Sequence, residues 1–280
     1  MNQVQAIYNG HAELAEGPVW HEGALWWVNI TAGTLNRLDL DTGHNASRGI
    51  GEYLGCAVPA PGEPGIWWLA GQQRLLRLDW NTGHLETLNT FPAMPPSLRL
   101  NDGKLDPRGR FWVGTLSLKG ELNRAALLRR DIDGSIQTMV EDVSLSNGMT
   151  WSASGERFFY IDTPTHEVTV YDYDLDAGTL SNRQVLSHLD STEGFPDGMC
   201  AGLADDLYVA MWGGAQILRL CQRTGQILDR IPVPVSQPSS VCLIPGDTPR
   251  LAITTAWQGL PRDPLSGPTT DGSIFVVDLK

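Results

Sequence analysis

Leu25-Trp26-Trp27 is the first of six short β-prone runs that recur along the whole chain. The other five are Ile66-Trp67-Trp68, Phe111-Trp112-Val113, Phe158-Phe159-Tyr160, Leu207-Tyr208-Val209 and Leu251-Ala252-Ile253. Their middle residues follow one another at steps of about 41 to 49 residues. A period of roughly 40 to 50 residues is typical of the blades of a β-propeller, so the repeat predicts six blades.

Turn signals follow these runs at matching places. Residues 38–43 read Leu-Asp-Leu-Asp-Thr-Gly, and residues 78–83 read Leu-Asp-Trp-Asn-Thr-Gly. Asp and Asn bond back to their own backbone and Gly supplies a positive φ, so both segments predict hairpin turns. No long amphipathic helix pattern intervenes, which excludes a parallel α/β sheet. We therefore expect an all-β, six-bladed β-propeller that forms a single domain over residues 1–280.

The last run, residues 273–278, needs a partner strand to close the ring, and the early segment from Gln3 to Tyr8 is available to provide it. We expect closure between these N- and C-terminal strands. Core positions are expected for the tryptophans in or beside the repeated runs. These are Trp26, Trp27, Trp67, Trp68, Trp80 and Trp112.

Composition excludes several classes of protein. The 280 residues include 20 Lys+Arg and 32 Asp+Glu, a formal net charge of -12, which repels nucleic acid. The N-terminus lacks a basic start, and no apolar run of about 18 residues occurs, so we expect neither secretion nor membrane insertion. The four cysteines lack a Cys-x-x-Cys spacing and fit reduced thiols in a cytoplasmic protein.

Four polar segments, rich in turn residues, are predicted to lie between strands. They are residues 15–20 (AEGPVW), 99–104 (RLNDGK), 145–149 (LSNGM) and 195–200 (FPDGMC). The candidate ligand in each segment is an oxygen-bearing residue that precedes the middle of the next repeated run by about 10 to 12 residues. In a propeller this common spacing puts the four residues at equivalent places in their blades, which converge on the axis.

The four residues are Glu16, Asn101, Asn147 and Asp197. Two carboxylates and two amide oxygens form a set of hard ligands for one divalent ion, and Ca²⁺, Zn²⁺, Mn²⁺, Fe²⁺ and Mg²⁺ all accept such ligands. The alternative is that each motif, taken alone, is only a turn. Their common spacing favours a metal site. No His-x-His or His-Glu-x-x-His pattern and no Gly-x-Ser-x-Gly elbow occurs, which disfavours histidine-zinc and serine hydrolases.

These four segments, together with the run Asn-Asp-Gly-Lys-Leu-Asp-Pro-Arg-Gly-Arg at residues 101–110, resemble the family of regucalcin (senescence marker protein), gluconolactonase and luciferin-regenerating enzyme. The likeness covers essentially the whole chain. It implies a six-bladed propeller with one catalytic divalent metal held by Glu16, Asn101, Asn147 and Asp197. It also implies a metal-dependent hydrolase that opens a sugar (aldono)lactone to the sugar acid.

The resemblance further implies residue roles. In the family, an Arg two residues before the first Asn contacts the substrate, and this position is Arg99 here. We expect Asn101 to contact the substrate as well. The family has an acidic residue about 18 positions after that Asn, where this chain has Lys119, with Glu121 two residues beyond. We expect Lys119 and Glu121 to bind substrate, and Asp197 to be the catalytic base that takes a proton from water.

Two other functions remain open at this point. The same metal site could serve another esterase or a phosphotriesterase, because a Lewis-acidic ion polarises a phosphoryl oxygen as it does a carbonyl. The chain could also be a metal-binding propeller without turnover, since a fold does not settle a function. The expected partner is a small-molecule lactone, with no nucleic acid, no membrane and no obligate protein partner.

Overall fold

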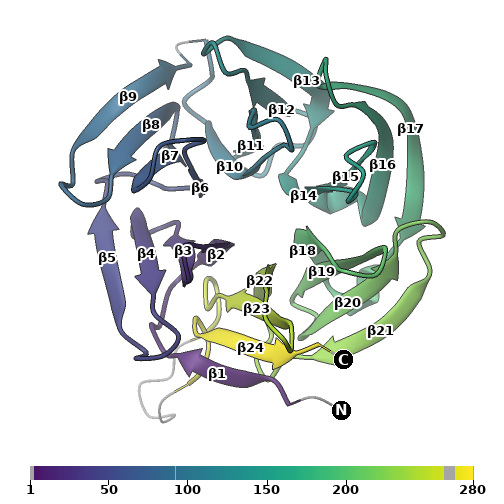
Figure 1. Ribbon diagram of the computed structural model, residues 1–280. Coiled ribbons are helices and arrows are strands. Elements are labelled where there is room, and N and C mark those ends of the chain that lie inside the picture. Colours follow the sequence, from purple (N-terminus) through teal and green to yellow (C-terminus); the bar gives the residue numbers. More distant parts are fainter. Residues whose placement is uncertain (1–2, 92, 262–268, 280) are drawn as a thin grey trace.

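Six four-stranded antiparallel sheets form a ring in the computed structural model, which describes residues 3–91, 93–261 and 269–279 (Figure 1). Each sheet is one blade. The strands nearest the centre of the ring are β2, β6, β10, β14, β18 and β22, with bounds given below. The predicted six-bladed β-propeller is confirmed.

The first three blades follow the chain in order. Blade 1 is β2 (Ala15–His21), β3 (Ala24–Asn29), β4 (Thr34–Leu38) and β5 (Asn45–Gly49). Blade 2 is β6 (Cys56–Pro59), β7 (Ile66–Ala70), β8 (Arg74–Asp79) and β9 (Leu85–Thr90). Blade 3 is β10 (Leu98–Leu105), β11 (Phe111–Ser117), β12 (Ala125–Arg130) and β13 (Ile136–Val143).

The remaining blades complete the ring. Blade 4 is β14 (Ser146–Trp151), β15 (Arg157–Asp162), β16 (Glu167–Asp174) and β17 (Thr179–His188). Blade 5 is β18 (Phe195–Ala201), β19 (Asp206–Trp212), β20 (Gln216–Cys221) and β21 (Ile227–Pro232). Blade 6 is β22 (Pro238–Ile244), β23 (Arg250–Thr255), β24 (Ile274–Asp278) and β1 (Gln5–Tyr8). Two short 3-10 helices, η1 (Thr163–Thr165) and η2 (Ser191–Glu193), lie in connections, and no helix of the described chain is long and apolar enough to cross a membrane.

The six repeated runs form the second strand of each blade, and their side chains build the core between neighbouring blades. The rings of Trp26 in blade 1 and Trp67 in blade 2 lie 4.3 Å apart, and those of Trp112 in blade 3 and Trp151 in blade 4 lie 5.8 Å apart. Five of the six predicted core tryptophans are buried, and Trp80 packs partly buried against the same core. Burial of these rings between sheet faces holds neighbouring blades together.

The predicted hairpin turns join the third and fourth strands of blades 1 and 2. In blade 1, a carboxylate oxygen of Asp39 accepts hydrogen bonds from the backbone N–H groups of Asp41 and Thr42, at 3.1 and 2.9 Å. Gly43 has a φ of 69°, a conformation that favours glycine. The Asp of the motif therefore accepts the backbone N–H groups of the turn, and the Gly adopts the positive φ that the turn requires.

Ring closure occurs between the two ends of the chain, as predicted. Strand β1 pairs antiparallel with β24, with Gln5 opposite Val276 and Ala6 opposite Phe275. Figure 1 shows β1 outside β24 at the rim of blade 6. The N-terminal strand thus covers an edge that would otherwise carry unpaired backbone groups.

Deleting residues 1–8 is expected to destabilise the protein, because β24 then becomes an exposed edge strand. The expected loss is roughly 5 to 10 °C in the midpoint of thermal unfolding, if the missing contacts contribute a few kcal/mol. Differential scanning calorimetry measures this directly. An unchanged midpoint would contradict the closing role of β1.

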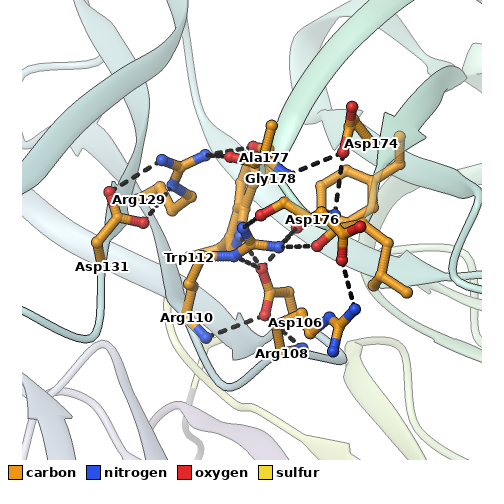
Figure 2. Close-up of polar contacts among 12 residues, drawn as sticks. Asp106, Arg108, Arg110, Trp112, Arg129, Asp131, Asp174, Asp176, Ala177 and Gly178 are labelled. Carbon is orange, nitrogen blue, oxygen red and sulfur yellow. Dashed lines mark hydrogen bonds and ion pairs between the residues drawn. The ribbon is translucent and has the colours of Figure 1, made fainter.

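A polar cluster joins blades 3 and 4 at the ends of their sheets (Figure 2). The buried carboxylate of Asp106, just after β10, accepts hydrogen bonds from Arg110 Nε, Trp112 Nε1 and the Tyr173 hydroxyl. Arg110 also donates to the carbonyl oxygens of Leu175 (2.6 Å) and Asp176 (2.9 Å) in the β16–β17 turn. The cluster therefore attaches the far end of β10 to the next blade.

Candidate functional site

The four predicted ligand segments lie inside the innermost strands, so the prediction that they lie between strands is wrong. Glu16 is in β2, Asn101 in β10, Asn147 in β14 and Asp197 in β18. At each of these points the pairing with the second strand of the blade shifts register. Such β-bulges use Gly, Asn and Asp, as turns do, which is why the pattern resembled a connection.

Blade 3 shows how a bulge presents a ligand. Leu100 pairs with Thr115 and Gly103 pairs with Val113, so Asn101 and the residue after it stand opposite a single residue of β11. A bulge bends the strand and redirects the side chains within it. The Asn101 side chain reaches the next innermost strand, where its Nδ2 lies 3.2 Å from Asn147 Oδ1.

The other two blades offer no equivalent ligand. Strand β6 pairs with β7 without a register shift and has Ala57 at the matching place. Strand β22 has a shift, but the hydroxyl of Ser239 donates to the carbonyl oxygen of Ala15 and lies 2.9 Å from the Thr254 hydroxyl. Blades 1, 3, 4 and 5 therefore supply the four candidate ligands.

Glycines after the ligands let neighbouring innermost strands approach closely. A Cβ on Gly148 would lie 2.5 Å from the backbone oxygen of Asp197, and one on Gly198 would lie 2.7 Å from the Cα of Ser240. Both distances are below 3.0 Å, which Cβ atoms in folded proteins essentially never show, so the neighbouring backbone would have to shift. The Asn-Gly and Asp-Gly pairs of the sequence are therefore required by close packing around the axis.

A chain of hydrogen bonds orders the two amide side chains. Arg99 Nη1 donates to Asn101 Oδ1 (2.8 Å), and Asn101 Nδ2 donates to Asn147 Oδ1 (3.2 Å). Asn147 Nδ2 donates to Thr163 Oγ1 (2.9 Å), whose hydroxyl donates to the carbonyl oxygen of Pro196 (2.8 Å). Each amide oxygen accepts one of these bonds and keeps a second lone pair that a cation could use.

Two carboxylates complete the set, and both are buried. Burial, followed by the repulsion of Asp102, raises the pKa of Glu16 to about 8. Burial and the neighbouring charges of Glu16 and Asp102 raise the pKa of Asp197 well above its usual value. The three carboxyl groups are thus close enough to repel one another, and a positive charge between them would relieve that repulsion.

These side chains fit a divalent cation. All four candidate ligands offer oxygen, the donor that Ca²⁺, Mg²⁺ and Mn²⁺ prefer. Within the described ranges no three His, Cys, Asp or Glu side chains form a metal-binding group. A cation at this place would therefore depend on the amide oxygens of Asn101 and Asn147 as much as on the carboxylates of Glu16 and Asp197.

The predicted substrate contacts fall in two places. Arg99 is buried beside Asn101, and its Nη1 also donates to the carbonyl oxygen of Leu100 at 2.8 Å. Lys119 and Glu121 are exposed on the connection between β11 and β12, where the Glu121 carboxylate accepts a hydrogen bond from the Ser117 hydroxyl at 3.1 Å. The structure brings Arg99 to the four candidate ligands, whereas no contact joins Lys119 or Glu121 to them in the described part of the chain.

Two residues of the site had no signal in the sequence. The ring of Tyr53 lies 5.8 Å from the Arg99 guanidinium carbon, and Thr163 orients the Asn147 amide. Tyr53 precedes the one innermost strand that lacks a bulge, and Thr163 lies in the short helix η1. Tyr53 contacts Arg99 of another blade, and Thr163 connects Asn147 of its own blade to Pro196 of the next one, so no local pattern could have identified them.

The metal-free protein is expected to lose stability as the pH rises from about 4.5 toward 8. The pKa of Glu16 is about 8 in the folded protein, whereas that of an unperturbed glutamate is 4.5. Between these two pH values the folded state keeps a proton that the unfolded chain releases. The free energy of unfolding therefore falls through this range. Thermal melts in a chelator at several pH values measure the slope. Glu16→Gln is the matched control and should flatten it; a chelated wild type whose midpoint rises with pH would contradict the expectation.

Comparisons with known proteins agree with this architecture. The family model described as "SMP-30/Gluconolactonase/LRE-like region" matches residues 14–257. Regucalcin of Danio rerio is 33% identical over 279 residues, which cover 98% of this chain and 94% of the relative.

Two solved structures share the fold. One is described as a calcium-binding protein, regucalcin, from Agrobacterium tumefaciens; it has a TM-score of 0.91 at 23% identity and covers 99% of this chain and 93% of its own. The other is a gluconolactonase from Xanthomonas campestris, with a TM-score of 0.79 at 19% identity, covering 100% of this chain and 90% of its own. At these identities the two likenesses establish the arrangement of the blades.

Proposed function

The chain belongs to the SMP-30/gluconolactonase/LRE-like family, and from that premise we propose that it is a divalent-metal-dependent lactonase that opens a sugar (aldono)lactone to the sugar acid. One observation carries the proposal. Four buried oxygen-bearing side chains lie at β-bulges in the innermost strands of four blades, and two of them are carboxylates. Glu16, Asn101, Asn147 and Asp197 would hold the ion.

A bound divalent ion would polarise the lactone carbonyl and acidify the attacking water. Asp197 would accept the proton of that water on a carboxylate oxygen as the water oxygen bonds to the carbonyl carbon. The ring C–O bond then breaks, and Asp197 returns the proton to the departing oxygen. Burial, Glu16 and Asp102 raise the pKa of Asp197 in the metal-free protein. A bound cation would lower that pKa again, so the proton transfer would depend on the ion acidifying the water as well.

Arg99 would hold the substrate. Its Nη1 is engaged with Asn101 and Leu100, and the rest of the guanidinium offers further N–H donors for sugar hydroxyls or an anionic substituent. The aromatic ring of Tyr53 packs against the same guanidinium and limits its movement. We further propose that Lys119 and Glu121, on their exposed connection, contact substituents of the substrate that project from the centre of the ring.

The setting of the reaction follows from the same observations. We propose that residues 1–280 act as one domain in the cytoplasm, on a small-molecule lactone and without an obligate protein partner. The free thiols of Cys56, Cys200, Cys221 and Cys242 suit a reducing compartment. The net charge of -12 suits a small-molecule substrate better than nucleic acid.

A pH-indicator assay tests the function and the metal together. The protein is treated with a chelator, and Ca²⁺, Zn²⁺, Mn²⁺, Fe²⁺ or Mg²⁺ is added back separately, before a panel of aldonolactones and phosphotriesters is supplied. We expect acid release from at least one aldonolactone, lost on chelation and restored by one or more ions. Turnover of phosphotriesters alone would assign a different hydrolase, and metal binding without any turnover would assign a non-catalytic propeller.

A further inference from the structure

A second layer of side chains lies three residues beyond the candidate ligands. Each innermost strand has one residue that pairs with the middle residue of its blade's repeated run. In the order of the blades these residues are Val19, Pro59, Lys104, Thr150, Cys200 and Cys242. Lys104 is the one charged residue of this layer.

Three members of the layer connect their blade to the next one. In each case the side chain lies against the backbone of the following innermost strand. The pairs are Thr150 with Ala201 (3.2 Å), Cys200 with Leu243, and Cys242 with Trp20. The rule in this part of the ring is therefore a contact between immediate neighbours.

Lys104 departs from that rule. Its Nζ donates to the carbonyl oxygen of Met199 at 3.0 Å. Lys104 is in β10 of blade 3 and Met199 is in β18 of blade 5, so the side chain extends past blade 4. The side chain is half-buried, and its charge also acts on the carboxylate of Asp102.

The two strands that Lys104 connects each carry a candidate ligand. Lys104 follows Asn101 by three residues and Met199 follows Asp197 by two, so the bond lies within roughly 10 Å of both along the strands. Both strands are bulged at the ligand, and a bulge interrupts the ladder that would otherwise hold the strand in place. The bond from Lys104 lies just beyond both bulges, so it restrains the two strands next to the points where their own pairing is interrupted.

We propose that Lys104 is a positioning residue for the candidate metal site, and that it sets the separation of Asn101 and Asp197 by joining their strands across blade 4. The inference rests on the proposed function, because it assumes that these residues bind a metal. Lys104 itself does not contact the ion or the substrate. It acts through the two strands.

The test compares Lys104 variants with a matched variant at another blade junction. Lys104→Met keeps most of the length of the side chain and removes its N–H donors. Lys104→Gln keeps an N–H donor, but on a side chain that is too short to reach Met199. Lys104→Arg keeps both reach and charge. Arg157→Met is the control, because Arg157 Nη1 also donates to a carbonyl oxygen of the next blade, that of Gln222 at 2.6 Å, yet lies away from the ligands.

Binding of Ca²⁺ alone to the full chain, measured by titration calorimetry, is the readout, with thermal melts beside it. We expect Lys104→Met and Lys104→Gln to weaken Ca²⁺ binding about tenfold, the low end of the effect of residues that orient metal ligands. Lys104→Arg should bind as the wild type does. Arg157→Met should lower the unfolding midpoint without changing the affinity for Ca²⁺.

The outcomes separate this inference from the proposed function. Removing a positive charge near a cation site would by itself tighten Ca²⁺ binding. Unchanged or tighter binding in Lys104→Met, or in Lys104→Gln if the Met variant does not fold, therefore overturns the positioning role. A wild type that binds no divalent ion overturns the proposed function and the inference with it. Weaker Ca²⁺ binding in Arg157→Met would show that the loss of any contact between blades weakens metal binding, and this would also overturn the positioning role of Lys104.

Discussion

Asp197→Asn is expected to abolish lactone hydrolysis while leaving the propeller folded, with turnover lowered by about 10³-fold, within the usual contribution of a general base. The amide has the shape of the carboxylate and can still offer an oxygen to a metal, but it cannot accept a proton from water. The measurement is the initial rate of acid release from the best aldonolactone at saturating metal. The affinity for Ca²⁺ should fall less than the turnover does.

Asp39→Asn is the matched control for this substitution. Asp39 lies in the exposed β4–β5 turn, and its carboxylate accepts hydrogen bonds only from residues of that turn among those described here. The control should keep wild-type activity. If Asp197→Asn retains near-normal turnover, Asp197 is not the base, and the reaction must draw its base from Glu16 or Asp102, the other two carboxylates of the site.

Asp106→Ala is expected to have the largest effect on stability, about 3 to 5 kcal/mol, because it removes the buried partner of a charged guanidinium. Asp106 Oδ2 accepts from Arg110, Trp112 and Tyr173, and Oδ1 accepts the backbone N–H of Arg110 at 2.9 Å (Figure 2). All of these donors would lose their acceptor at once. Chemical denaturation measures the change in the free energy of unfolding.

Asp176→Ala is the control from the same cluster. The Asp176 carboxylate contacts Arg108, and its side chain is 84% exposed, so we expect a loss of less than about 1 kcal/mol. The large difference between the two aspartates would show that burial, rather than charge, decides their contributions. Equal losses would mean that Asp106 does not hold blades 3 and 4 together.

Local pattern was sufficient for the fold. The aromatic runs recur at the blade period because every blade must bury the same second strand. The Asp-x-x-x-Gly turns recur at residues 39–43, 79–83 and 174–178 because hairpins join the third and fourth strands of blades 1, 2 and 4. The closing strand was predictable because one edge at each end of the chain lacked a partner. The common spacing of Glu16, Asn101, Asn147 and Asp197 predicted that they occupy equivalent places.

The local sequence pattern wrongly placed these four residues in connections between strands. Asn-Gly and Asp-Gly pairs are favourable in turns and in bulges alike. Here the close approach of the neighbouring blade requires the glycine of each pair. Gly148 must admit the backbone of Asp197, and Gly198 must admit Ser240, a requirement that exists only once the blades are assembled. The predicted roles of Lys119 and Glu121 stay predictions, because both residues lie on an exposed connection.

The amino-acid sequence by itself determined the number of blades, the closure of the ring and the four candidate ligands, because each of these depends on a spacing along the chain. The tertiary structure alone decided that the ligands lie in bulged innermost strands, that Thr163 orders the Asn147 amide and that Lys104 reaches Met199. The last of these contacts joins residues 95 positions apart. A ring brings such residues together through its curvature, which no repeat within one blade encodes.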